Sequence, residues 1–405
     1  HGGISPITAN AVFEGPVKKD TASFIFSIRS SYSDWILSRL KDTIINKSNA
    51  DFKDFAGGLN WDFKKTQIAI FGYRSSDNFS LSDLSNYSYS NTGASLIIDH
   101  NFSNSLRGEI SLAGSDYAFS TIDKLEKSSS FTHSYELKHY EISTSFRQML
   151  NRNYLEYGGS FILYKLDRGT VVPYGEASLL DNVYLGKEDG IENSLFLSDS
   201  YTIKPGINLT AGLRYTLYSP IGPEKIYHYY PGSPRDAENI SDTSFFKKNS
   251  PIRWYHEPDI RVALNIETDR EGSVKLAFNQ THQNLFMLNT TTTVAPNTQW
   301  KLADYHLAPS RSNQISLGIF RSIQKNGLEA SLEVYYKRTS NYPEFKDGAD
   351  FLENPLVETS VLQGDQKAYG IEAYLKRSNR RLEGWLSYSY SRSLMQVNGG
   401  KSWNR

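Results

Sequence analysis

Apolar and polar side chains alternate along residues 313–338, with one interruption. The first arm places Ile315, Leu317 and Ile319 on one face, and after the turn 324–327 (Gln-Lys-Asn-Gly) the alternation resumes from Leu328 to Tyr336. A period of two residues is typical of a β-strand, and Asn-Gly between two such arms is typical of a hairpin turn. The second face carries charged side chains, so the pattern predicts a hairpin with one face against an apolar medium and the other against water.

The same alternation returns elsewhere in the chain. Residues 155–164, 207–218 and 369–376 each place apolar side chains on one face and polar or charged side chains on the other. The charges always fall on the same side of the alternation. This pattern is typical of a transmembrane β-barrel that is apolar towards lipid and polar towards its lumen.

The alternation predicts about 16 strands along the chain. They lie near residues 4–16, 22–37, 51–64, 66–82, 90–102, 106–124, 134–150, 154–173, 185–203, 207–222, 255–268, 273–288, 312–323, 328–346, 362–377 and 381–397. Short turns alternate with long, irregular connections, of which the longest runs from Pro223 to about Trp254. Short turns at one rim and long loops at the other indicate an antiparallel up-and-down barrel of the bacterial outer-membrane kind. Several strands exceed the roughly 9–11 residues that cross a bilayer, so the wall is predicted to stand above the membrane.

Composition narrows the function classes. The 405 residues include 44 basic and 44 acidic side chains, which cancel and give no indication of nucleic-acid binding. Cysteine is absent, which excludes disulfides, thiol nucleophiles and zinc–cysteine sites. The mean hydropathy is −0.50, and no apolar run approaches the roughly 18–20 residues of a membrane helix. Barrel strands alternate and average out in hydropathy, so these values are compatible with a membrane barrel.

Several strings of residues resemble the TonB-dependent outer-membrane transporters of the Bacteroidota, the group that includes SusC-like receptors. They are FEGPVKKDTASFIFSIRSSYSDWIL from Phe13, FNQTHQNLFMLNTTTTVAPNTQWKLADYHLAPSRSNQISLG from Phe278, VYYKRTSNYPEFKDGADF from Val334 and QGDQKAYGIEAYLKRSNRRLEGWLSYSYSRS from Gln363. The resemblance covers most of the chain but not the 223–254 loop. It is specific for the barrel and says almost nothing about the substrate.

The resemblance implies a barrel of about 22 strands, with a plug domain and a short TonB-contacting segment before it. Neither is recognisable here, and the ends, His1-Gly2-Gly3 and residues 399–405, look like cut points. We therefore interpret residues 1–405 as one barrel domain truncated at both ends. The implied partners are outer-membrane lipid and lipopolysaccharide, the TonB–ExbB–ExbD system through the N-terminal region, and a SusD-like surface lipoprotein or other envelope proteins.

No constellation of catalytic residues is recognisable. The chain has no GxSxG, Walker or HExxH motif, and its Gly-x-Gly spacings do not lie between a strand and a helix. His133 and His139 share a strand face but are about 20 Å apart at 3.3 Å per residue, too far to share a metal ion. We predict no enzyme activity, no cofactor and no metal site.

Charged side chains on the polar faces are candidates for the lumen lining. They are Arg214, Glu329, Glu333, Lys337, Glu372 and Lys376. One interpretation is that they solvate the wall and contact a plug, and the other is that they line the path of a substrate. Tyr215, Tyr336 and Tyr369 fall on the lipid-facing register, where aromatic residues form an interfacial girdle.

Aromatic side chains in the long loops are candidates for contact with a cargo or a partner protein. They are Tyr227, Tyr229, Tyr230, Trp254, Trp300 and Tyr305. Such residues stack on sugars or grip a protein, or they only pack a loop against its neighbours.

Three functions are compatible with these patterns. The first is energised import of a scarce nutrient, such as a glycan, a peptide or a metal chelate, across the outer membrane of a Gram-negative bacterium. The second is a structural or assembly role for a receptor-like barrel in a larger outer-membrane complex. The third, a secreted soluble β-protein, rests on the low mean hydropathy.

Overall fold

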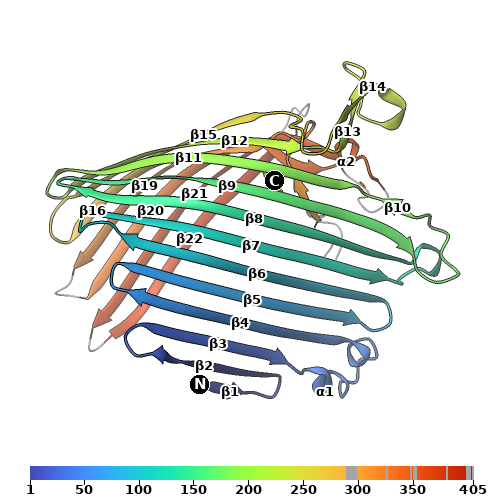
Figure 1. Ribbon diagram of the computed structural model, residues 1–405, viewed down its shortest axis with the longest axis horizontal. Helices are drawn as coiled ribbons and strands as arrows, with labels where there is room; N and C mark the ends of the chain where they lie inside the picture. Colours follow the sequence, from blue (N-terminus) through green and yellow to red (C-terminus); the bar gives the residue numbers. More distant parts are fainter. Residues whose placement is uncertain are drawn as a thin grey trace.

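A computed structural model describes residues 1–288, 299–323, 327–346, 349, 354–379, 382–397 and 403. Its main feature is a curled antiparallel wall (Figure 1). Sixteen long strands of the described residues form it: β2 (Thr8–Lys18), β3 (Ala22–Ser31), β4 (Asn49–Phe63), β5 (Thr66–Leu81), β6 (Ser85–Asn101), β7 (Leu106–Asp123), β8 (Phe131–Leu150), β9 (Asn153–Pro173), β11 (Lys187–Lys204), β12 (Ile207–Ile221), β15 (Tyr255–Glu267), β16 (Gly272–Gln283), β19 (Ser310–Ile323), β20 (Leu328–Phe345), β21 (Val361–Asn379) and β22 (Leu382–Val397). The predicted strands and the all-β, up-and-down class are confirmed.

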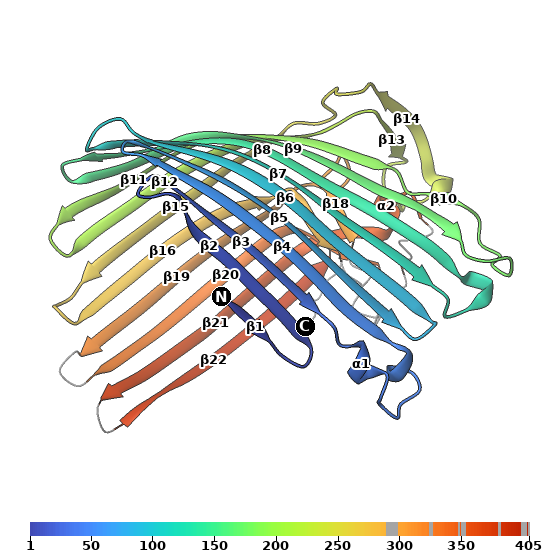
Figure 2. The ribbon, with the colours of Figure 1, turned by 60° about the horizontal axis from the view of Figure 1, so that its bottom comes forward.

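Each wall strand pairs with the next one along the chain, in a meander. The short strands β1 (Gly2–Ile4) and β10 (Val183–Tyr184) pair with β2 and β9 and complete an 18-stranded sheet. Within the described residues no pairing joins β22 to β1 or β2, so β1 and β22 are the two edges of the sheet. The sheet curls so that the C-terminal strands face the N-terminal ones across a lumen (Figures 1 and 2).

Short turns gather at one end of the wall and long connections at the other. The turns after β2, β4, β6 and β8 lie at the left of Figure 1, whereas the short helix α1 (Asp34–Leu37), β10 and the β13–β14 hairpin lie at the right. Several turns use left-handed backbone, among them those at Asn151 (φ 51°) and Gly206 (φ 82°). Asn and Gly adopt this conformation at low cost, which explains the local choice of residue. The predicted turn 324–327 is described only at Gly327, since 324–326 lie outside the described residues.

The two faces of the wall follow the predicted alternation. On β19 and β20 the apolar positions face outwards, and Ile315, Leu317 and Leu332 are 50%, 41% and 44% exposed. Cross-strand partners share a face, and Leu332 lies opposite Ile319 and Ala373. The inward positions carry the charges, so the wall is apolar outside and polar inside.

The strand register shows that the wall strands are tilted. One row of paired residues crosses seven strands: Ala22, Trp61, Ile68, Ile98, Ile110, Thr144 and Gly159. Ala22 is the first residue of β3, whereas Gly159 lies six residues beyond the start of β9 at Asn153. Tilted strands whose short turns lie at one level produce such a stepwise shift of register. The register therefore agrees with short turns that lie together at one rim.

The outer surface changes character along the longest strands. Tyr140 and Ile142 on β8 are exposed apolar residues, and further from the short turns come Lys138 and Glu136, which form a 2.9 Å ion pair. The apolar part matches the membrane span, and the charged part stands beyond it. This agrees with the predicted extension of the wall.

Three predicted irregular or continuous segments differ in the structure. The 223–254 loop contains a hairpin of β13 (Glu224–Tyr229) and β14 (Ile240–Phe246), with η3 (Ala237–Asn239) between them. The predicted strand 273–288 ends at Gln283, and β17 (Leu285–Leu288) leaves the wall to pair with β18 (Gln299–Leu302). The predicted strand 22–37 ends at Ser31 and is followed by α1. Other short helical turns are η1 (Ile45–Lys47), η2 (Lys127–Ser129) and α2 (Val357–Ser360).

The face assignment can be tested by placing a charge on either side of β20. Leu332→Arg puts a cation on the outer face, where the cost is about 2–4 kcal/mol near the bilayer midplane. Ser331→Arg, one residue away, points inwards and should insert normally. We expect heat-modifiable membrane-inserted protein to be lost only for Leu332→Arg; equal insertion of both variants of the full-length protein would show that the register is wrong.

Candidate functional site

A hairpin from the wall crosses the lumen near the long-loop end. We call β17–β18 and its described residues the lumen hairpin. It leaves the wall between β16 and β19, yet β17 lies beside β20 and β18 lies beside β9 and β11. Figure 2 places β18 between the two sides of the wall. Residues 289–298 of the predicted 289–311 loop lie outside the described residues.

The second strand of the lumen hairpin, β18, packs against aromatic side chains on the inner face of the wall. Leu302 is 1% exposed and joins a cluster of inward side chains from β6, β7, β8 and β9: Tyr87, Phe119, Tyr135, Leu137 and Leu166. Trp300 contacts Tyr117 edge-on, with 6.4 Å between ring centroids. Burial of this apolar surface favours the inward position of the hairpin.

A buried ion cluster fixes the same strand. It consists of Arg168, Glu188, Lys301 and Asp304. The Lys301 ammonium lies 3.0 Å from Glu188 Oε1 and 2.5 Å from Asp304 Oδ2, and its side chain is only 4% exposed. The N–H of Leu302 donates to Glu188 Oε2 at 3.0 Å, and Arg168 Nε lies 3.8 Å from Glu188 Oε1. A buried cation is tolerable only when paired in this way, so removal of a partner should be costly.

The charges of this cluster stabilise one another. Burial by itself would lower the pKa of Lys301, but the carboxylates of Asp304 and Glu188 outweigh burial and raise it above its ordinary value. Burial by itself would raise the pKa of Asp304, but Lys301 and the N–H groups of Leu307 and His306 outweigh burial and lower it. Both groups are therefore charged at neutral pH.

A single amide joins the root of the lumen hairpin to the wall. Asn284 Nδ2 donates to Glu192 Oε2 on β11 and to Glu257 Oε2 on β15, both at 3.1 Å. The backbone then closes the root, since the N–H of Ala303 donates to the carbonyl of Asn284 at 2.7 Å. Tyr218 on β12 donates its hydroxyl to the carbonyl of Ala303 at 2.6 Å. The hairpin is thus attached to three neighbouring wall strands.

The predicted loop aromatics divide between this site and the outer surface. Tyr230 and Trp254 are exposed, at 57% and 44%. Tyr229 is half-buried and donates its hydroxyl to Glu358 at 3.0 Å, and Tyr305 contacts His228 edge-on. Tyr227 is half-buried and accepts, at its carbonyl, a hydrogen bond from His306 Nε2. Trp300 lies inside the lumen, so only Tyr230 and Trp254 of the six are presented outwards as largely free surfaces.

The predicted lumen-lining residues all occupy the inward register. Arg214 stacks over Phe196 at 4.9 Å and pairs in register with Asp259. Lys376 lies 3.5 Å from Glu329. Glu333 and Glu372 lie directly opposite each other, and Lys337 lies four residues beyond Glu333 on β20, on the same face. These six residues line β12, β20 and β21 and do not converge on one point.

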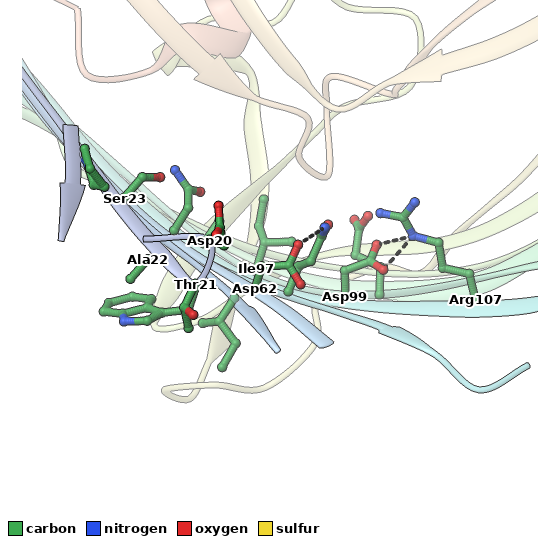
Figure 3. Close-up of a pocket in the computed structure, with 15 residues that line it drawn as sticks. Asp20, Thr21, Ala22, Ser23, Asp62, Ile97, Asp99 and Arg107 are labelled. Carbon is green, nitrogen blue, oxygen red and sulfur yellow. Dashed lines mark hydrogen bonds and ion pairs between the residues drawn. The ribbon is translucent and has the colours of Figure 1, made fainter. Parts of the chain in front are cut away.

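A second concavity lies at the short-turn end and was not predicted. Its volume is about 800 Å³, and Figure 3 shows Asp62, Asp99 and Arg107 in it. Arg107 Nε donates to both carboxylate oxygens of Asp99, at 2.5 and 2.7 Å. Asp20, Asp62 and Glu109 add further negative charge. Charged side chains are thus combined with apolar ones such as Ile97 on this inner surface, which can accommodate a cationic or hydrogen-bonding group.

A family comparison accounts for this architecture. The sequence profile of the family described as TonB dependent receptor-like, beta-barrel, matches residues 16–405. The chain belongs to this family. The barrels of TonB-dependent receptors lie in the outer membrane of Gram-negative bacteria, and the family consists of transporters and receptors.

Solved structures of import receptors and a transporter share the fold. The chain is similar to the ferric-catecholate import receptor Fiu of Escherichia coli K12 in its closed form (TM-score 0.64, 11% identity, covering 98% of this chain and 63% of that one). It is also similar to the copper transporter OprC (0.67, 11%, 95% and 61%) and to the ferripyoverdine receptor of Pseudomonas aeruginosa (0.63, 13%, 97% and 55%). At these identities the likeness concerns the fold alone.

The chain of this TonB-dependent receptor barrel spans about three fifths of the length of the structures it resembles. Among curated proteins, none matches the sequence. Because no curated protein matches, the subtype within the family stays a prediction.

No helix in the described part of the chain is long and apolar enough to cross a membrane.

The ion cluster makes a sharp prediction for the lumen hairpin. Lys301→Met should leave Asp304 without its cation and Glu188 with only the more distant Arg168, at a cost of about 3–5 kcal/mol. We expect faster hydrogen exchange of the amides of residues 299–307 in the full-length protein, measured by mass spectrometry. Lys376→Met breaks an exposed pair worth about 0–1 kcal/mol and serves as the control. Equal protection in both variants would show that the cluster does not hold the hairpin.

The base of the β13–β14 hairpin should respond to pH through Glu224. Burial raises the pKa of Glu224 from 4.5 to about 8. The negative charges of Glu188, Asp304 and Glu358 raise this pKa further, whereas the positive charge of Lys301 lowers it. The carboxyl is protonated in the folded state and ionises when the hairpin opens. Opening should therefore become more favourable as pH rises from about 4.5 to about 8, with no further change above.

The useful window for this measurement is pH 6.5 to 8. Burial lowers the pKa of His306, so protonation of His306 would favour opening only below about its ordinary value of 6.5. In the window, hydrogen exchange of residues 224–229, corrected for intrinsic rates, should reveal more opening at higher pH. Glu224→Gln should flatten this dependence; an unchanged slope in the variant would assign the dependence to another group.

Proposed function

We propose that this barrel belongs to an importer that takes up a scarce nutrient across the outer membrane, with energy supplied through TonB–ExbB–ExbD. Membership of the TonB-dependent receptor family carries this proposal. The polar inner face supports it, because a wide barrel lined by charged and aromatic side chains offers a wet route through lipid. The implied energising partner contacts the full-length protein through an N-terminal region.

The lumen hairpin gives the importer an outer closure. It crosses from β20 to β9 and β11, and Lys301 and Asn284 attach it to the wall. Each buried ion pair is either formed or broken. A closure that such pairs hold therefore changes between two arrangements and does not move gradually. In this proposal cargo enters beside the hairpin or displaces it, and it then meets the charged lining of β20 and β21.

A metal chelate is the cargo class that we favour among glycans, peptides and metal chelates. Fiu, the ferripyoverdine receptor and OprC are described as handling ferric chelates or copper. The aromatic inner face of β6–β9, with Phe119 and Tyr135 rings 5.1 Å apart, suits flat aromatic or chelating ligands. No described residue set selects one chelate, so the class is as far as this proposal goes.

A partner protein on the cell surface is the second element of the proposal. The β13–β14 hairpin projects from the long-loop end, well separated from α1 (Figures 1 and 2). Phe245 is 77% exposed and Tyr230 57% exposed, and Lys225 lies over the rings of Tyr227 and Phe245. Large exposed aromatic side chains are typical of protein contact sites. A SusD-like lipoprotein or another envelope protein is the partner we propose for this surface.

A structural role in a larger outer-membrane complex is the alternative. The same projecting hairpin favours it, because a scaffold needs a permanent contact surface and no cargo path. Under this alternative the lumen hairpin would close the barrel permanently.

Removal of residues 227–246 distinguishes the two roles, since none of the wall strands lies in that span. We expect the full-length deletion variant to insert normally and to lose part of its uptake of radiolabelled ferric or cupric chelate, measured with and without the proton-motive force. The control is the parent protein without the deletion. Unchanged energised uptake with a lost envelope partner would support the structural role, and an effect on neither would exclude this hairpin as a contact surface.

A further inference from the structure

The loop between β3 and β4, residues 32–48, exposes an unusual number of large apolar side chains. Trp35, Leu40, Ile44 and Ile45 are 47%, 43%, 48% and 41% exposed. No residue of α1 within this loop is buried. Nearly half of the surface of each of these four side chains is thus left uncovered by the described residues.

The length of β3 sets the level at which this loop leaves the wall. β3 has 10 residues, which span about 33 Å of strand, or about 25 Å along the membrane normal at a tilt of about 40°. This equals the roughly 25 Å apolar band of an outer-membrane barrel. β9 has 21 residues and reaches about 53 Å by the same arithmetic. Because the short turns share one rim, the β3–β4 loop emerges at the outer edge of the lipid, far below the loop after β9.

The apolar outer face of the wall continues directly into this loop. Phe26 and Ile28 on β3 are 42% and 36% exposed, and Phe55, the neighbour of Ile28 on β4, is 42% exposed. These side chains lie on the face that meets lipid. Tyr32 and Trp35 follow one and four residues after the end of β3 at Ser31. The loop thus extends an interface with lipid rather than starting a separate patch.

The polar groups of the loop suit the headgroup region. The Trp35 indole N–H donates to the carbonyl of Pro6 at 2.8 Å, which fixes the ring at the surface, and the Arg39 guanidinium lies 5.3 Å from that ring. Trp beside a cation is the pair that membrane proteins use at this depth. Arg39 and Lys41 are both exposed and can reach phosphate groups while their stems lie along lipid.

The loop carries two acidic residues, Asp34 and Asp42, against the three basic residues Arg39, Lys41 and Lys47. The Asp42 carboxylate accepts hydrogen bonds from the N–H groups of Ile44 and Ile45 at 2.8 and 3.0 Å, which lower its pKa and fold the turn. This turn holds Ile44 and Ile45 side by side at the tip. The amphipathic arrangement is that of a segment lying in a membrane interface.

We propose that the β3–β4 loop is an interfacial anchor: Trp35, Leu40, Ile44 and Ile45 insert among the outer-leaflet lipids, and Arg39 and Lys41 bind the phosphate groups of their anionic heads. The anchor fixes the depth of the wall where its strands are short, away from the tall strands β8 and β9. It depends on membrane insertion of the barrel and not on the identity of the cargo.

The absence of cysteine from this chain allows site-directed spin labelling of single positions. The full-length protein is placed in nanodiscs of phosphatidylcholine, or of phosphatidylcholine and phosphatidylglycerol in equal parts. We expect a nitroxide at Leu40→Cys to collide several-fold more with lipid-soluble oxygen, relative to water-soluble nickel chelate, than one at Leu179→Cys. Leu179 is an equally apolar and more exposed residue, at 84%, in the loop after β9.

One further label and one further variant make the outcome decisive. Leu317→Cys lies on the lipid face of β19 and reports whether the barrel is inserted at all. Arg39→Gln with Lys41→Gln should remove the extra depth that phosphatidylglycerol gives to the Leu40→Cys label. Lipid contact at 317 with water contact at 40 in both lipids would overturn the anchor alone, whereas water contact at 317 would overturn the membrane barrel. Shielding of position 40 from both collision reagents would assign the loop to a protein contact and also overturn the proposal.

Discussion

Every backbone hydrogen-bonding group of a strand in lipid must find its partner within the protein, and the rest of the structure depends on this constraint. The meander from β2 to β22 satisfies it between neighbouring strands, and within the described residues only the outer edges at β1–β2 and at β22 lack a partner strand. Pairing in turn fixes which side chains share a face. A one-residue slip would turn Leu332 inwards and Glu333 into lipid, so the apolar face and the register stabilise each other.

The inner face is polar and can therefore hold charged side chains, which the lipid-facing surface cannot. Lys301 can be buried there because its ammonium is paired with Glu188 of β11 and with Asp304, three residues further along the chain. Two apolar clusters, one around Leu302 and one around Phe286 and Leu288, bury the hairpin, and the ions specify one position for it. These buried ion pairs are either formed or broken, with few intermediate arrangements. The hairpin is therefore suited to act as a closure, in contrast to the exposed β13–β14 hairpin, which is suited to contact a partner.

The wall could be predicted from the sequence because its pattern repeats over long segments. Alternation over ten or more residues with short turns identified each of the sixteen strands, although β3 and β16 were extended too far into the following loops. The short hairpins were missed because strands such as β18, four residues long, are too brief for a period of two to be recognised. The ion cluster was missed for another reason. Lys301 and Glu188 are 113 positions apart, and only the fold brings them together.

The lumen position of β18 is the central structural claim, and a crosslink across the lumen tests it most directly. Trp300 and Tyr117 are far apart in sequence, yet their rings lie 6.4 Å apart. With cysteine at both positions in the full-length protein, in its membrane, we expect a short bifunctional maleimide to join them within one chain. Failure to crosslink while both cysteines react with a single maleimide would contradict a hairpin that crosses the lumen.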